Sequence, residues 1–304
     1  MAGLSRELLL LNLGYRPPIP ASSEELYRLA TLNRIGLATL SSLVEAGFVL
    51  PPRLERELTR LLSLSREIMG EFARVGGVLE RAGVEYAVFK SLRPYPSTTV
   101  DIDVLIFRGY WRAYRALRRS GYEPLGAGPE SVTLRRRGGP VSVDLYREPA
   151  VSRLVYLDRE GLRGLVEDRE TPAGPVKALR READAVAFID HSIVKEQLIT
   201  AADVVTVLKL LEDADLALFH QVVRSQASQA CTALFLWASL RALRGRIELP
   251  YRVKPATLAW VLACKGRLGA ARRSIAQQAT YLASPARTLR FLRELHHHLV
   301  RPTY

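Results

Sequence analysis

Segments with the pattern of β-strands are confined to the middle of this 304-residue chain, and helical patterns lie on both sides of them. The β-rich runs are residues 84–89, 100–107, 131–136 and 141–146. Gly138-Gly139 joins the last two runs as in a hairpin, and residues 109–121 have the apolar spacing of a helix. The order strand, strand, helix, strand, strand predicts a small mixed sheet with a helix on one face. A last strand is expected near Val176.

The residues before this stretch have the pattern of helices. Ser22-Ser23-Glu24-Glu25 is typical of a helix start, because a serine can cap the helix and a later glutamate can reach back to it. Pro51-Pro52 precedes a second helix, whose leucines recur at helical spacing and which is expected to end near Gly83.

The pattern becomes helical again after about Leu179. Thr200 and Asp203 predict the capped start of a helix that runs to about Leu211, and apolar helices are expected through residues 217–243 and 255–268. We therefore expect an α+β fold in which helical regions flank the small sheet. The predicted regions are a helical N-terminal region (1–82), an α/β core (83–179) and a basic helical C-terminal domain (180–304).

The run at residues 100–107 places two aspartates on one face of a strand. Successive side chains of a strand point to opposite faces, so Asp101 and Asp103 project together while Ile102 and Val104 point to the buried face. Two neighbouring carboxylates repel each other and are costly unless a cation neutralises them. Mg²⁺, or Mn²⁺ in its place, suits this pair because it takes oxygen ligands and bridges carboxylates to substrate phosphates.

Asp144 repeats the same pattern on another predicted strand, with Val143 and Leu145 on the opposite face. If this strand lies beside the one that carries Asp101 and Asp103, three carboxylates converge, as phosphoryl transfer with two metal ions requires. The alternative is that Asp-x-Asp occurs by chance and the aspartates are solvated on an exposed face, since short motifs often match without a function.

The turn before the paired aspartates strengthens the interpretation. Lys90-Ser91 lies between the first two predicted strands, followed by Asp101-Ile102-Asp103 and later by Asp144. This combination resembles the nucleotidyltransferases of the DNA polymerase β superfamily. Their signature is Gly-Ser or Gly-Gly at a strand–helix turn, a short gap, an Asp-x-Asp strand and a third acid on a later strand. The resemblance covers residues 84–148, less than a quarter of the chain, and is greatest to uncharacterised archaeal and bacterial members with Lys before the small residue.

The resemblance implies a role for each of these residues. Ser91 would lie at a helix N-terminus and hold the triphosphate of a nucleotide, because free backbone N–H groups there favour anions. Asp101 and Asp103 would hold both metal ions, and Asp144 would complete the second metal site and help to activate the incoming hydroxyl. Lys90 departs from the pattern, since the superfamily usually has Gly there. It either contacts phosphate directly or crowds the turn and leaves a protein that only binds.

His191 and Lys195 lie one turn apart on a predicted helix, so both side chains can face the cleft and touch phosphate or base. We therefore include them among the candidate nucleotide-binding residues. The alternative is a structural histidine packed beside Ala187, Val194 and Leu198.

Composition indicates a globular protein of a reducing compartment. Hydrophobic residues make up 48% and charged residues 25%, which is ordinary for a soluble protein. The two cysteines, Cys231 and Cys264, argue against a disulfide framework. The apolar run at residues 8–11 is too short for a signal peptide or a membrane span, so we expect a cytoplasmic protein without a membrane partner. Scarce Asn, Met and Cys hint at a heat-adapted source.

Positive charge is concentrated at the C-terminal end. Residues 241–304 contain thirteen Lys and Arg and two acidic residues, a net charge of +11 out of +13 for the whole chain. This asymmetry predicts a surface for nucleic acid, with RNA as the simplest partner. The alternative is a solvated charged surface. The candidate RNA-binding residues are Arg267, Arg272, Arg273, Arg287, Arg290 and Arg293.

The leading hypothesis is a metal-dependent nucleotidyltransferase that moves a nucleoside monophosphate from an NTP such as ATP to a hydroxyl, with an RNA such as a tRNA end as acceptor. A second hypothesis is a non-catalytic RNA-binding or scaffold protein on a degenerate transferase fold, and Mg²⁺-dependent NTP binding distinguishes the two. Modification of a protein or a small molecule is a third possibility, but it would leave the C-terminal basic region without a purpose.

Overall fold

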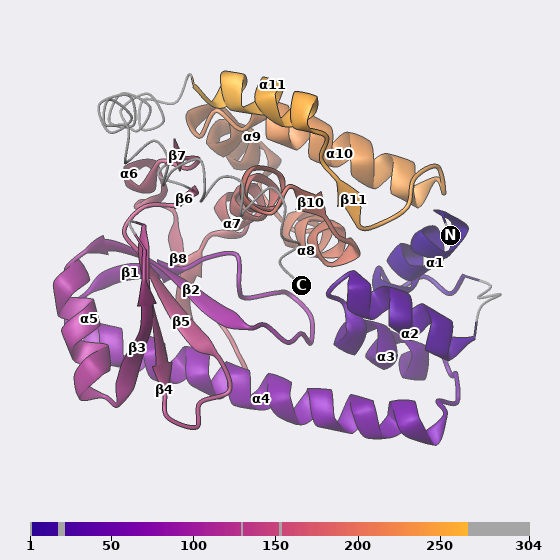
Figure 1. The fold of residues 1–304 in the computed structure, drawn as a ribbon, viewed down its shortest axis with the longest axis horizontal. Helices are drawn as coiled ribbons and strands as arrows, with labels where there is room; N and C mark the ends of the chain where they lie inside the picture. The colour runs from indigo at the N-terminus through magenta and orange to yellow at the C-terminus, as the bar shows by residue number, and fades with distance from the viewer. Residues whose placement is uncertain (1, 18–21, 129, 152–153, 267–304) are drawn as a thin grey trace, which may run out of the picture.

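The structure is a computed structural model that describes residues 2–17, 22–128, 130–151 and 154–266. A twisted sheet has helices on both faces, and the long helix α4 (Pro52–Arg81) runs below both the sheet and the first helices of the chain (Figure 1). The predicted combination of helices with a mixed sheet is confirmed. Within the described ranges, no helix has the length and apolar character needed to cross a membrane.

Four helices precede the sheet: α1 (Ala2–Asn12), α2 (Ser23–Leu32), α3 (Gly36–Glu45) and α4. The predicted start of α2 is confirmed, since Ser22 accepts a hydrogen bond from the backbone N–H of Glu25 and the Glu25 carboxylate accepts one from the N–H of Ser22. α4 is 30 residues long, begins at Pro52 and ends just before Gly83, as its leucine spacing predicted.

The central sheet has seven strands in the order β3-β4-β5-β2-β1-β9-β8. The strands are β1 (Glu85–Val88), β2 (Asp101–Arg108), β3 (Tyr122–Ala127), β4 (Ser131–Arg136), β5 (Ser142–Tyr146), β8 (Val166–Arg169) and β9 (Val176–Leu179). The pairs β2–β5 and β1–β9 are parallel and the other neighbours are antiparallel, so the sheet is mixed as predicted. Helix α5 (Tyr110–Arg119) follows β2.

Strands β3 and β8, at the two edges of the sheet, were not predicted from the sequence. β3 contains Pro124 and Gly126, its register shifts between them, and most of its residues are exposed. β8 has the sequence Val-Glu-Asp-Arg and lacks an alternating apolar pattern. An edge strand tolerates proline and charge because one side of its backbone is unpaired, so it lacks the signals of a buried strand.

Each face of the sheet packs against different helices. Val88, Ile102, Val104 and Val143 lie in a core with side chains of α4 and α5. On the opposite face, residues that include Phe89, Leu105 and Tyr146 belong to a second core with the helices that follow the sheet. The paired aspartates share this second face, because they alternate with Ile102 and Val104 along β2.

The helices after the sheet are α7 (Arg181–Asp190), the π-helix η1 (His191–Lys195), α8 (Ala201–Leu211), α9 (Leu216–Ser225), α10 (Gln229–Leu243) and α11 (Pro255–Lys265). The predicted capping of α8 by Thr200 and Asp203 is confirmed, and α8 ends at Leu211 as expected. Short elements complete the fold: β6 (Ala150–Val151) with β7 (Leu154–Val155), α6 (Arg159–Leu162), and β10 (Leu198–Ile199) with β11 (Tyr251–Arg252).

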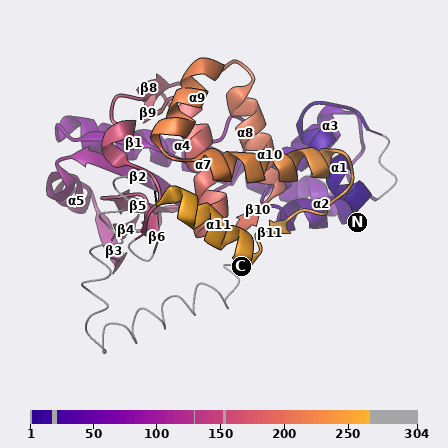
Figure 2. The ribbon, with the colours of Figure 1, turned by 90° about the horizontal axis from the view of Figure 1, so that it is seen from above.

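The first and last parts of the described chain share one hydrophobic core, and Figure 2 shows α1 beside α10. Asn33, after α2, links them: its amide nitrogen donates to the Leu249 carbonyl at 3.1 Å, and its amide oxygen accepts from the Ala201 N–H at 2.9 Å. The predicted division into three regions stays a prediction.

Candidate active site

The three predicted carboxylates lie together on two neighbouring strands. Asp103 on β2 pairs directly with Asp144 on the parallel strand β5, and Asp101 pairs with Ser142. One carboxylate oxygen from each of Asp101, Asp103 and Asp144 lies within 4.8 Å of the others. The predicted convergence is confirmed, and it follows from the two-residue period of the strands and their parallel register.

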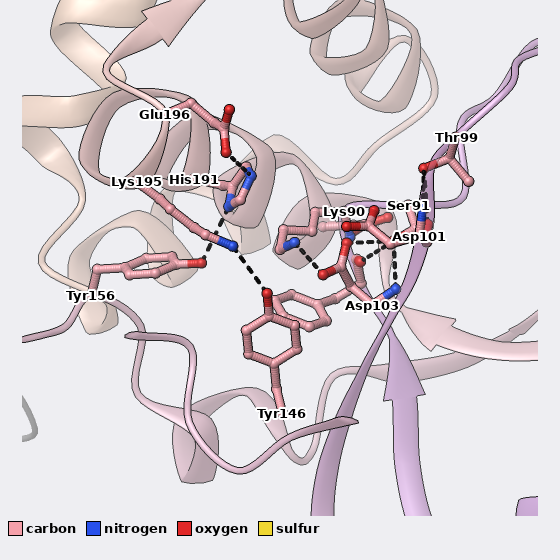
Figure 3. A network of polar contacts seen from close by, with 12 residues as sticks. Lys90, Ser91, Thr99, Asp101, Asp103, Tyr146, Tyr156, His191, Lys195 and Glu196 are labelled. Carbon is pink, nitrogen blue, oxygen red and sulfur yellow. Dashed lines mark hydrogen bonds and ion pairs between the residues drawn. The ribbon is translucent and has the colours of Figure 1, made fainter. Parts of the chain in front are cut away.

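Lys90 forms a buried ion pair with one member of this group. Its ammonium lies 2.5 Å from Oδ1 of Asp103, with both side chains almost fully buried (Figure 3). The same nitrogen is 5.1 Å from the ring centre of Phe89 and 5.2 Å from that of Tyr146. Lys90 therefore neutralises Asp103 from inside the site instead of projecting outward toward a ligand.

The Lys90 backbone has a φ of 49°, in the left-handed region. Its N–H donates to Oδ1 of Asp184 at 2.7 Å, and the other oxygen of Asp184 accepts from Arg169 at 2.9 Å. A buried carboxylate on α7 thus holds the turn after β1 in a conformation that usually favours glycine.

Ser91 does not lie at a helix N-terminus, so this implication of the resemblance is wrong. Residues 89–100 between β1 and β2, all of which the structure describes, form no helix. Pro94 and Pro96 explain the difference, because proline lacks an N–H donor and disfavours helical conformation in the residue before it. The Ser91 hydroxyl instead donates to Oδ2 of Asp103 and accepts from the Asp103 N–H, each at 2.8 Å. Ser91 thus positions Asp103.

The carboxylates differ in their proton affinity. The charge of Asp103, and then burial, raise the pKa of Asp101 to about 6. Burial also acts to raise the pKa of Asp103, but Lys90 and Lys195 outweigh it and hold that pKa below its ordinary value. Burial raises the pKa of Asp144, and the charge of Asp103 adds to the effect. The negative charge is therefore held most firmly on Asp103.

The aspartate group fits a divalent cation of the Mg²⁺ type. Three carboxylates face two ammonium groups, Lys90 and Lys195, so the site carries excess negative charge when all three are ionised. Oδ1 of Asp144 is buried and has no hydrogen-bond partner among the described residues. Oxygen donors with an unsatisfied buried lone pair are the ligands that a hard cation takes.

Figure 3 places the residues of η1 opposite the aspartates. His191 Nε2 lies 3.4 Å from Oε1 of Glu196, and His191 Nδ1 lies 3.4 Å from the hydroxyl of Tyr156. Burial, and then the charge of Lys90, lower the pKa of His191 to about 3, so its ring is neutral near pH 7. Arg34 forms an ion pair with Glu196 at 3.1 Å. Both ring nitrogens of His191 therefore have protein partners. This agrees with the alternative expectation that His191 is a structural histidine.

Lys195 is the cation of this site that faces the aspartates without a paired carboxylate. Its ammonium donates to the Tyr146 hydroxyl at 3.0 Å, and among the described residues no carboxylate oxygen lies within 4.0 Å of it. Burial, and then Lys90, lower the pKa of Lys195. An ammonium whose hydrogen-bond partner, within the described part of the chain, is a neutral hydroxyl is suited to a ligand anion.

Sequence reasoning did not identify Tyr146, Tyr156, Glu196, Asp184 or Arg34. Tyr146 follows Asp144 by two residues on the same strand, so the two-residue period carried a usable signal. The others come from distant segments, and no local pattern indicates them. The six candidate RNA-binding arginines, from Arg267 to Arg293, lie outside the described residues, and their role stays a prediction.

No family model matches this sequence, and a comparison with curated proteins finds no match.

Proposed function

We propose that the protein is a metal-dependent nucleotidyltransferase that moves a nucleoside monophosphate from an NTP to a hydroxyl acceptor. The observation that carries the proposal is the convergence of Asp101, Asp103 and Asp144 on adjacent strands opposite Lys195. A mixed sheet with paired acids on one strand and a third acid on its neighbour agrees with the nucleotidyltransferase type of fold. Mg²⁺ or Mn²⁺ held by the three carboxylates would neutralise phosphate charge.

In this proposal the residues of the site have separate tasks. The acceptor oxygen forms a bond to the α-phosphorus while the bond from that phosphorus to the bridging oxygen breaks, and pyrophosphate leaves. Asp144 accepts the hydroxyl proton, and burial raises its pKa above the ordinary value, which favours proton uptake. Lys195 binds a phosphate oxygen. Lys90 and Ser91 keep Asp103 ionised and fixed in position. His191 stabilises the η1 side of the site through its contacts with Glu196 and Tyr156.

Nucleotide binding tests this proposal before any acceptor is known. A non-hydrolysable NTP analogue is titrated by calorimetry with Mg²⁺ and with EDTA. We expect binding that requires Mg²⁺ and is lost or weakened at least tenfold in Asp101→Asn and Asp144→Asn. Asp168→Asn, an exposed aspartate on β8 of the same sheet, is the matched control and should bind normally. Binding that is independent of Mg²⁺ and of both site variants would reject the proposal.

A second candidate function is non-catalytic binding of RNA. The observation that favours it is helix α5, which carries four arginines and no acidic residue. Trp111 on this helix is 56% exposed, and the guanidinium of Arg147 lies 4.7 Å from its ring centre. Exposed aromatic rings among arginines suit the stacking of single-stranded bases. RNA binding that Trp111→Ala weakens, together with no Mg²⁺-dependent NTP binding, would favour this candidate.

A further inference from the structure

A cavity of about 960 Å³ lies between α4, the segment 92–97, the connection from β8 to β9, and α8. None of the three aspartates lines it. Part of its wall is apolar, formed by Leu62, Met69, Pro94 and Leu210. Its size and mixed lining are those of a site for a small organic ligand.

Arg93 is one of the charged residues that line this cavity. Its Nη1 donates to the Tyr95 hydroxyl at 3.0 Å and to Oγ1 of Thr206 at 3.2 Å, and its guanidinium carbon lies 5.5 Å from the ring centre of Phe188. Among the described residues no carboxylate oxygen lies within 4.0 Å of the guanidinium, and Nε and Nη2 have no hydrogen-bond partner. Burial acts to lower the pKa of Arg93, but interactions with Tyr95 and Asp203 outweigh it and raise that pKa. Among the described residues the guanidinium donates hydrogen bonds to neutral hydroxyls alone, so it retains donors for an anion.

Lys209 adds a second such cation. Its ammonium lies 5.8 Å from the ring centre of Tyr95 and, within the described part of the chain, has no carboxylate partner. Two other cations of the wall are already paired, Arg169 with Asp184 and Arg181 with Asp213. The acidic residues that line the cavity, Glu170, Glu212 and Asp213, are exposed. The cations of the wall without an ion pair among the described residues are therefore Arg93, Lys209 and Arg66, and they outnumber Glu170 and Glu212.

We propose that this cavity binds a nucleoside monophosphate unit, with the phosphate on Arg93 and Lys209 and the nucleoside against the apolar wall. The chain itself connects this cavity to the aspartates: Lys90 and Ser91 contact Asp103, and the next two residues, Leu92 and Arg93, line the cavity. The bound unit is the terminal nucleotide of the acceptor. That last assignment rests on the proposed function, whereas binding in the cavity does not.

Calorimetry in EDTA tests the proposal, because a metal-dependent site at the aspartates contributes nothing there. The probes are AMP, inorganic phosphate and adenosine. We expect wild-type protein to bind AMP at least tenfold more tightly than phosphate or adenosine, since only AMP uses both parts of the cavity. Lys209→Met and Arg93→Met should each weaken AMP binding about tenfold or more. Lys177→Met, a lysine of β9 outside the cavity, and Asp101→Asn should leave it unchanged.

Lys209→Met decides the outcome if Arg93→Met disturbs the fold, because Lys209 makes no hydrogen bond or ion pair within the described residues. The thermal unfolding of both variants is measured alongside. Absence of AMP binding in EDTA, or AMP binding that Lys209→Met leaves unchanged, would overturn the proposal. Phosphate binding as tight as AMP binding would overturn the nucleoside part. AMP binding that needs Mg²⁺ and is lost in Asp101→Asn would place the ligand at the aspartates. If the wild-type protein binds AMP in EDTA but transfers no nucleotide from an NTP, only the proposed function is rejected.

Discussion

Electrostatic repulsion among the aspartates is the main energetic feature at the scale of single residues. Asp101 lies beside Asp103, whose charge Lys90 and Ser91 stabilise, so Asp101 is the member of the pair that titrates most readily. Its pKa of about 6 lies above the ordinary value of 3.8. The folded protein therefore binds a proton at Asp101 more tightly than the unfolded chain does, and ionised Asp101 destabilises the folded state.

Asp101→Asn should consequently stabilise the protein in EDTA at pH 8, where Asp101 is ionised in both states. The upper limit of the gain is about 3 kcal/mol, the free-energy equivalent of the raised pKa, and relaxation reduces it to about 1–2 kcal/mol. The gain should shrink as the pH falls from about 6 to 4, because protonation then relieves the repulsion in the wild-type protein. Thermal unfolding at pH 8 and pH 4.5 measures it. A loss of stability at pH 8 would show that Asp101 is not repelled by its neighbours.

Lys90 combines an ion pair with a backbone conformation that favours glycine. Lys90→Ala should destabilise the protein in EDTA by about 2–4 kcal/mol, because Asp103 loses its buried counter-charge. Lys90→Gly should be about 1 kcal/mol more stable than Lys90→Ala, since glycine adopts a positive φ without strain. Mg²⁺ should raise the unfolding temperature of both variants more than that of wild type. Equal stability of the Ala and Gly variants would contradict backbone strain at residue 90. A Mg²⁺ effect on the unfolding temperature that is equal in the variants and in wild type would contradict a cation site at Asp103.

At the scale of elements, the connection between β1 and β2 is held by α7 and β8. Asp184 on α7 accepts hydrogen bonds from the Lys90 N–H and from Arg169 of β8. Arg169 also donates to the carbonyl of Leu92. The Asp184–Arg169 pair therefore contacts both ends of the turn that carries Lys90 and Ser91. The π-helix η1 follows α7 directly and brings His191 and Lys195 to the same site. Such π-helical turns are frequent at functional sites.

Asp184→Ala should lower the free energy of unfolding by about 2–3 kcal/mol at pH 8. Alanine removes the acceptor of the Lys90 N–H and leaves Arg169, among the described residues, with Glu167 as its charged partner, 3.3 Å away. Denaturant unfolding measures the change. Asp168→Asn, the exposed neighbour of Arg169, is the control and should stay within about 0.5 kcal/mol of wild type. A loss no greater than that of the control would mean that Asp184 does not hold the turn.

At the scale of the whole molecule, the sequence predicts what depends on local periodicity. The alternation around Asp101, Asp103 and Asp144 correctly placed three carboxylates on one face, and the capping residues Ser22 and Thr200 correctly placed helix starts. Contacts between distant segments were not predictable. Asp184 lies 94 residues from Lys90, and Arg34 lies 162 residues from Glu196. The expectation that Ser91 lies at a helix N-terminus was wrong. It came from the resemblance, and Pro94 and Pro96 disfavour a helix there.

The position of the transferred label tests nucleotidyl transfer most directly. The protein is incubated with Mg²⁺ and each NTP labelled at either the α- or the γ-phosphate, in the presence of total RNA or a protein and small-molecule extract. We expect the acceptor to gain the α-label, with one pyrophosphate released per nucleotide added, in wild type and in Asp168→Asn but not in Asp101→Asn or Asp144→Asn. An acceptor labelled only from the γ-phosphate, or α-label transfer that survives in both site variants, would contradict the assignment of these aspartates to nucleotidyl transfer.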